Sequence, residues 1–177
     1  DFAPLHGVLP FYCVGGNHDV GDLNSIINVF ERGYAQYKKY DFCDVREPEQ
    51  RYRDGECWYQ FFEEQELLLV GIGWNLEESR EERNAWLDSV LDAYAEYPVV
   101  ILTHGYLYNN GKPNDIGIAL EKEIISRHPN VRLLLCGHHR RARRQQIVYE
   151  DGRTFTAVMF NLQEEKKRPA IGYCMLV

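Results

Sequence analysis

The sequence predicts an α/β fold in which layered, mixed β-sheets are flanked by helices. Two observations support this prediction. Short apolar runs of strand length alternate with stretches whose apolar residues recur at helical spacing, and two hairpin signals interrupt that alternation. A length of 177 residues fits one domain with a sizeable core, and no repeat or linker divides it. We therefore expect residues 1–177 to form a single domain.

The first half of the chain predicts four strands, two of which form a hairpin, and one helix. Residues 8–14 are an apolar run that predicts a buried strand, and residues 22–40 carry apolar side chains at helical spacing. Asp54-Gly55 separates two strand-like runs, which is typical of a hairpin. The hairpin strands and the strand after them are expected at residues 51–53, Cys57–Phe62 and Leu67–Ile72.

The second half continues the alternation and ends in strands. One apolar helix face is predicted before Pro98, which ends the helix. That face consists of Trp86, Leu87, Val90, Leu91 and Tyr94. The segments expected after it are a strand at 99–102, a helix at 115–127, a strand at Val131–Cys136, a hairpin at 146–149 and 154–160, and a strand at 171–177.

Charge and composition narrow the classes of partner. The net charge of −7 argues against a broad nucleic-acid-binding face, and no apolar run reaches the roughly 20 residues that span a bilayer. The local exception is a basic run of Arg140, Arg141, Arg143 and Arg144. It could bind nucleic acid, but a solvated rim of a phosphate site or a charged sheet edge is the more ordinary interpretation.

The five cysteines show no Cys-x-x-Cys spacing and cannot all pair with one another. This excludes a zinc-finger interpretation and mildly favours a reducing compartment such as the cytoplasm. Localisation otherwise stays open.

Three apolar strands each end at a histidine with glycine nearby. The first strand runs into Asn17 and His18, the strand at 99–102 runs into His104, and Val131–Cys136 runs into His138. Ligands of α/β sheets bind outside the carboxyl ends of the strands, so three such ends would bring the imidazoles to one crevice. Imidazole is a metal ligand when neutral and an acid when protonated, which makes this a candidate catalytic site.

These motifs resemble the calcineurin-like metallophosphoesterase family. Gly16-Asn17-His18-Asp19, then His104, then Gly137-His138 match the order and spacing of the family motifs over nearly the whole chain. The resemblance implies an αββα sandwich and metal-dependent hydrolysis of phosphate mono- or diesters. The substrate would then be a phosphorylated small molecule or a phosphodiester.

The resemblance also implies a role for each residue. Asn17, His104 and His138 would ligate the second of two divalent metals, and ligand type leaves Mn, Fe, Zn and Ni open. His18 would contact the phosphate and protonate the leaving oxygen, and Asp19 would orient His18.

Two departures from the family pattern concern the first metal. The Asp-x-His and Gly-Asp-x-x-Asp motifs that should precede Asn17 do not occur, so we expect the chain to be the C-terminal part of a longer domain and to hold at most one metal by itself. In the third motif Arg140 stands where the family has a second ligating histidine. Arg140 could bind substrate phosphate instead, and the neighbouring His139 is a candidate substitute ligand or phosphate contact.

Three functions therefore remain open at the level of sequence. The first is a phosphoesterase with metal-activated water as nucleophile, active in the complete protein. The second is a catalytically degenerate binding or scaffold domain, and the third is a nuclease that uses the arginine run. The sequence does not indicate an oligomeric state, and the loops at 73–78 and 106–117, where substrate would be selected, carry no recognisable code.

Overall fold

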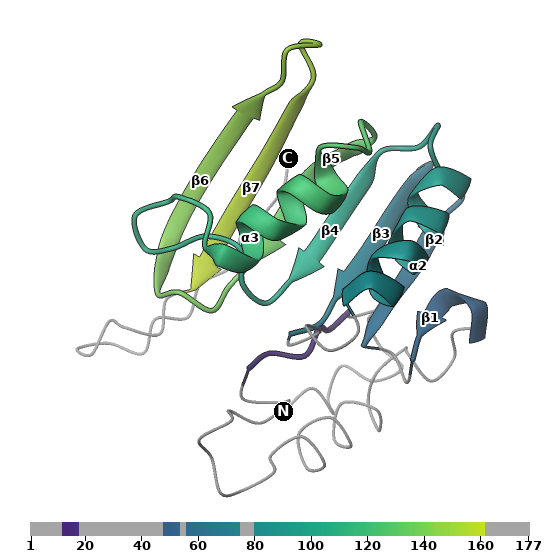
Figure 1. The fold of residues 1–177 in the computed structure, drawn as a ribbon, viewed down its shortest axis with the longest axis horizontal. Helices are drawn as coiled ribbons and strands as arrows, with labels where there is room; N and C mark the ends of the chain where they lie inside the picture. The colour runs from purple at the N-terminus through teal and green to yellow at the C-terminus, as the bar shows by residue number, and fades with distance from the viewer. Residues whose placement is uncertain (1–11, 18–47, 54–55, 75–79, 162–177) are drawn as a thin grey trace, which may run out of the picture.

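The computed structural model describes residues 12–17, 48–53, 56–74 and 80–161 (Figure 1). Seven strands of this part form one mixed sheet in the order β1-β2-β3-β4-β5-β7-β6. The strands are β1 (Arg51–Tyr52), β2 (Cys57–Phe62), β3 (Leu67–Ile72), β4 (Val99–Thr103), β5 (Val131–Cys136), β6 (Arg141–Val148) and β7 (Thr154–Asn161). The helical segments are η3 (Pro48–Gln50), α2 (Arg80–Ala93), α3 (Asp115–Leu120) and the π-helical turn η5 (Glu121–Ile125).

The centre of the sheet is parallel and its two ends are antiparallel. β3, β4, β5 and β7 run in the same direction. At one end β2 pairs antiparallel with β3 and β1 pairs antiparallel with β2, and at the other end β6 pairs antiparallel with β7. Parallel strands expose their carboxyl ends at one edge of a sheet. The loops after β3, β4 and β5 therefore begin at the same edge.

Helices α2 and α3 lie on one face of the sheet (Figure 1). The buried side of α2 is the apolar stripe of Leu87, Val90 and Leu91, which recurs at helical spacing. Asn114 caps the N-terminus of α3, and its Oδ1 accepts a hydrogen bond from the backbone N–H of Gly117 at 2.8 Å. This N-cap satisfies a helix-end donor that would otherwise lack a partner.

Residues 12–17 pack on the side of β2 opposite α2. Tyr59 of β2 contacts Tyr94 beyond α2, with ring centroids 5.6 Å apart. Its neighbour Trp58 points the other way, as strand geometry requires, and contacts the ring of Tyr12 at 5.6 Å. The indole N–H of Trp58 also donates to the carbonyl of Cys13 at 2.8 Å. Trp58 is 1% exposed, so this aromatic hairpin is core.

The predicted α/β fold is confirmed, and several elements fall where expected. β2, β3 and β5 have the predicted bounds. The helix predicted at 115–127 is a six-residue α3 continued by η5. The strand predicted at 8–14 is wrong over residues 12–14, which belong to no strand, while residues 8–11 lie outside the described part. The segments at 22–40 and 171–177 also lie outside it.

β6 is longer than expected and changes the interpretation of the basic run. It begins at Arg141, so Arg141, Arg143 and Arg144 belong to the strand at one end of the sheet order. Charged side chains on such an edge discourage pairing with other chains.

Within the described ranges, the structure contains no helix with the length and apolar character needed to cross a bilayer.

Candidate metal centre

Three predicted ligands meet at the carboxyl edge of the sheet. His104 Nε2 lies 2.8 Å from Asn17 Oδ1 and 3.0 Å from His138 Nδ1. His104 directly follows β4, and His138 lies two residues beyond β5. The parallel pairing of β4 and β5 therefore brings the two imidazoles together from distant positions in the chain.

Backbone hydrogen bonds hold the segment that carries Asn17. The N–H of Trp74, just beyond β3, donates to the carbonyl of Gly15 at 2.9 Å, in addition to the bond from Trp58 to Cys13. Gly16 lies directly against the His104 ring, because a Cβ on this residue would approach His104 Cε1 to 2.7 Å. Only glycine permits so close an approach, which explains its place immediately before Asn17.

The backbone at His138 is strained. Its φ is 60°, in the left-handed region where a non-glycine residue costs on the order of 1–3 kcal/mol. Asn161 at the end of β7 donates through Nδ2 to the His138 carbonyl at 3.2 Å, and the N–H of Gly137 donates to the His104 carbonyl at 3.0 Å. These bonds help to hold a conformation that places Nδ1 of His138 beside His104.

Trp74 forms a wall against both histidines. Its ring centroid lies 4.9 Å from that of His138 and 5.4 Å from that of His104, edge-on to the latter. Gly105 permits this packing, since a Cβ there would lie 2.9 Å from Trp74 Cζ3. The indole thereby limits the directions in which the two imidazoles can turn.

The three converging atoms suit a divalent cation. An amide oxygen and a neutral imidazole nitrogen each offer a lone pair, and a cation among Asn17, His104 and His138 would stabilise all three. Donors on neighbouring positions around an ion at about 2.1 Å are roughly 3 Å apart, similar to the 2.8 and 3.0 Å observed. In the described ranges no group of three or more His, Cys, Asp and Glu is placed to hold a metal. The third atom that converges with the two imidazoles is the amide oxygen of Asn17.

The residues that follow His138 take different positions. The ring of His139 packs on Tyr108 at 5.1 Å and on His138 at 4.6 Å. Arg140 is exposed. Arg143 donates through Nε to the carbonyl of Asn109 at 2.8 Å and thus supports the loop that carries Tyr108. This contact gives one arginine of the basic run a structural role.

Some predicted site residues cannot be placed, and some contacts were not predicted. His18 and Asp19 lie outside the described residues. Trp74 and Asn161, which contact the histidines or their backbone, were not singled out from the sequence. Trp74 lies two residues beyond a predicted strand, at the same sheet edge as His104 and His138, and that position was the available signal. No feature of the sequence indicated a role for Asn161.

Comparison with known proteins supports the family resemblance. The family model for calcineurin-like phosphoesterases matches residues 1–140. The uncharacterized protein YvnB of Bacillus subtilis (strain 168) is 25% identical, over 81% of this chain and 11% of its own length. The chain thus spans about a ninth of that relative. Because the family model covers most of the sequence, the chain belongs to the calcineurin-like phosphoesterase family.

Proposed function

We propose that this chain supplies one metal-binding half of a phosphoesterase site and that the complete protein hydrolyses phosphate mono- or diesters. Asn17, His104 and His138 hold a divalent ion of the Mn, Fe, Zn or Ni group. Residues 1–177 act as one domain, the C-terminal part of a longer one.

The observation that carries the proposal is the meeting of three side-chain atoms. His104 Nε2 lies 2.8 Å from Asn17 Oδ1 and 3.0 Å from His138 Nδ1. These atoms come from three separate segments of the chain, and hydrogen bonds from Asn161 and Gly137 help to hold the strained backbone at His138. Strain held at a site by surrounding bonds is typical of functional residues. Family membership supplies the reaction class.

Each residue has a proposed part in the reaction. Asn17, His104 and His138 would hold a divalent ion, which when bound would offset the charge of the phosphate oxygens and make water a better nucleophile. His18 follows Asn17 in the sequence and gives a proton to the leaving oxygen, while Asp19 fixes the tautomer of His18. Arg140 binds a phosphate oxygen pair through its guanidinium, and His139 is a second candidate contact.

The test is hydrolysis of an aryl phosphate monoester and an aryl phosphate diester by the complete protein with Mn²⁺ added. We expect turnover that falls by at least about a hundredfold in His18→Ala, as for loss of a general acid. Equal turnover in the variant would contradict the role of His18. In the isolated 177-residue chain we expect little or no turnover.

A binding or scaffold domain is the second candidate, and Arg140 favours it. This residue stands where the family places a second ligating histidine. Metal binding without turnover in the complete protein would support this alternative over the hydrolase.

A further inference from the structure

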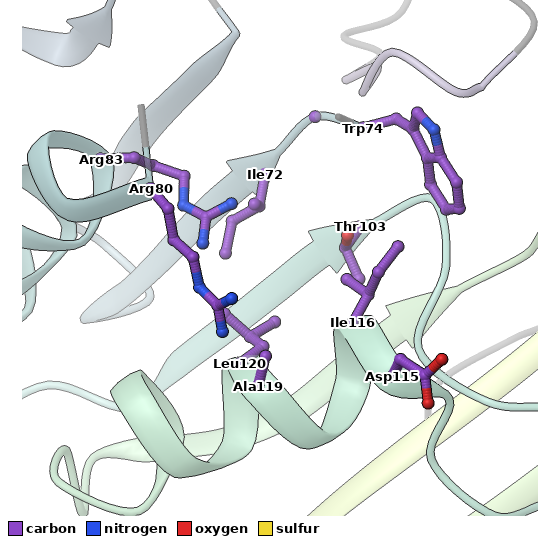
Figure 2. Close-up of a pocket in the computed structure, with 10 residues that line it drawn as sticks. Ile72, Trp74, Arg80, Arg83, Thr103, Asp115, Ile116, Ala119 and Leu120 are labelled. Atoms are coloured by element: carbon purple, nitrogen blue, oxygen red, sulfur yellow. The ribbon is translucent and has the colours of Figure 1, made fainter. Parts of the chain in front are cut away.

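A cavity of about 260 Å³ lies between α2, α3 and the carboxyl ends of β3 and β4 (Figure 2). Its wall combines two arginines of α2 with apolar side chains of β3 and α3. Its lining includes Arg80, Arg83, Trp74, Thr103, Asp115 and Ile116. Thr103 directly precedes His104, and Trp74 is shared with the histidine pair, so the cavity adjoins the candidate metal centre.

The charges at the α2 end of the cavity do not balance. Arg80 donates through Nε to Glu123 Oε2 at 2.8 Å and forms an ion pair with that carboxylate. Arg83 instead donates through Nε and Nη2 to the neutral amide oxygen of Asn84, at 3.1 and 2.9 Å. One carboxylate therefore faces two guanidinium groups, and in the described part of the chain Arg83 forms no ion pair.

Arg83 is a partly buried cation. Burial lowers its pKa, and the neighbouring charge of Arg80 acts in the same direction, whereas Cys57 and Glu123 oppose the change. A buried charge without a partner of opposite sign is costly, and an anion beside it removes part of that cost. The guanidinium group is well suited to carboxylate and phosphate oxygens.

The opposite end of the cavity has a different character. Asp115 is exposed and lies away from both guanidinium groups (Figure 2). The intervening wall includes Ile72, Ile116, Ala119 and Leu120. Small-molecule sites are typically concave and mostly apolar with a few placed polar groups, and 260 Å³ is just below the range for drug-sized ligands.

We propose that this cavity binds a small organic oxyanion, with its carboxylate or phosphate group on Arg83 and its carbon skeleton against the apolar wall. The ligand is short, because the cavity is small. The site does not depend on a metal at the histidine pair. It would place a small organic anion, a substrate or an effector, in a cavity that Trp74 also lines beside the candidate metal centre.

The test is calorimetric titration of the full chain in the presence of a metal chelator. The probes are butyrate and butylphosphonate, with inorganic phosphate and 1-butanol as the matched probes that lack the carbon skeleton or the charge. We expect saturable binding of at least one organic anion, at least about tenfold tighter than either matched probe, as for a charge-assisted hydrogen bond combined with apolar burial. Comparison of butyrate with butylphosphonate shows which oxyanion the site prefers.

Substitutions locate the binding. Arg83→Gln should weaken binding of the preferred anion by about tenfold or more. Arg132→Gln replaces an exposed arginine of β5 and should leave the affinity unchanged. Ile116→Trp is a second variant that fills the cavity from a side chain 39% exposed, and it should abolish binding even if Arg83→Gln fails to fold. No saturable binding, or binding unaffected by both cavity variants, would overturn the proposal. If the chain binds the organic anion but does not bind Mn²⁺ in a separate titration without chelator, the result would contradict the metal centre and leave the anion site in place.

Discussion

His104 Nε2 lies 3.0 Å from His138 Nδ1 although 34 positions separate the two residues in sequence. The parallel register of β4 and β5 produces this proximity, because it brings the ends of both strands to one edge. Trp74 then limits the rotation of both rings from a third strand end. The pair is therefore built by the sheet itself, and its ligand properties should respond to small changes around it.

Mn²⁺ should stabilise the 177-residue chain against thermal unfolding. A ligand that binds only the folded state at a hundred times its Kd adds about 2.7 kcal/mol to the free energy of unfolding. His104→Ala and His138→Ala should each remove the Mn²⁺-dependent rise in Tm, because each deletes one of three donors. The measurement is Tm with and without Mn²⁺ by calorimetry.

His139→Ala is the matched control for that experiment. The His139 ring packs on Tyr108, so its removal should leave most of the Mn²⁺-dependent rise in place. Loss of the rise in His139→Ala would instead identify this residue as the substitute ligand that the altered third motif suggested. An unchanged rise in His104→Ala would contradict the ligand set.

Gly16→Ala should weaken Mn²⁺ binding. The new Cβ would lie 2.7 Å from Cε1 and 2.8 Å from Nδ1 of His104, so the ring must move. Displacing a ligand through a neighbouring residue typically costs 10- to 100-fold in metal affinity, and we expect a loss of roughly that size. The measurement is the Mn²⁺ dissociation constant by calorimetry.

Gly15→Ala provides the matched control, because a Cβ at Gly15 meets nothing within 4 Å. Its Mn²⁺ affinity should equal that of the wild type. Equal losses in both variants would mean that the effect comes from chain stiffness and not from contact with His104.

The sequence predicted the strands of the sheet better than it predicted residues 12–14, which lead to Asn17. β2, β3 and β5 are apolar runs bounded by turn residues, so local patterning was enough to place them. Residues 12–14 are as apolar as a strand, but they belong to no strand, and Tyr12 and Cys13 contact Trp58 instead. Only tertiary contacts determine that outcome.

The candidate site shows the same division. His104 and His138 could be predicted because each follows a strand that patterning defines. The hydrogen bond from Asn161 to the His138 carbonyl could not be predicted, since it depends on β7 lying beside β5 in the sheet order. The π-helical turn after α3 also has no local signal, and it cut short a helix that periodicity extended to residue 127.

Gly71→Ala should strongly destabilise the fold. Gly71 lies opposite Trp58 in the β2–β3 pairing, and a Cβ there would fall 2.1 Å from Trp58 Cε2. Because Trp58 is 1% exposed, its ring has no free space to enter, and overpacking of this kind costs roughly 3 kcal/mol. The measurement is the free energy of unfolding in urea.

The coupling between Gly71 and Trp58 can be measured directly. In a Trp58→Phe background the smaller ring leaves room for the new methyl group, so Gly71→Ala should cost at least about 1 kcal/mol less than in the wild type. An equal cost in both backgrounds would show that the destabilisation arises from the strand backbone and not from this contact.

Glu123 should make stability depend on acid pH. Burial opposes ionisation of Glu123, but hydrogen bonds from Arg80 and Asn84 outweigh it and lower the pKa below the ordinary value of 4.5. A carboxylate with a lowered pKa in the folded state stabilises the protein above its unfolded-state pKa, and that contribution is lost as the pH falls through the folded-state value. Glu123→Gln should therefore be less stable than the wild type near neutral pH, and the difference should shrink only below pH 4.5. Urea unfolding across this pH range measures the difference in stability between the variant and the wild type. Glu81→Gln, which replaces an exposed carboxylate of α2, is the matched control. A difference between Glu123→Gln and wild type that stays constant down to strongly acid pH would show that the Arg80–Glu123 pair does not depend on the charge of Glu123.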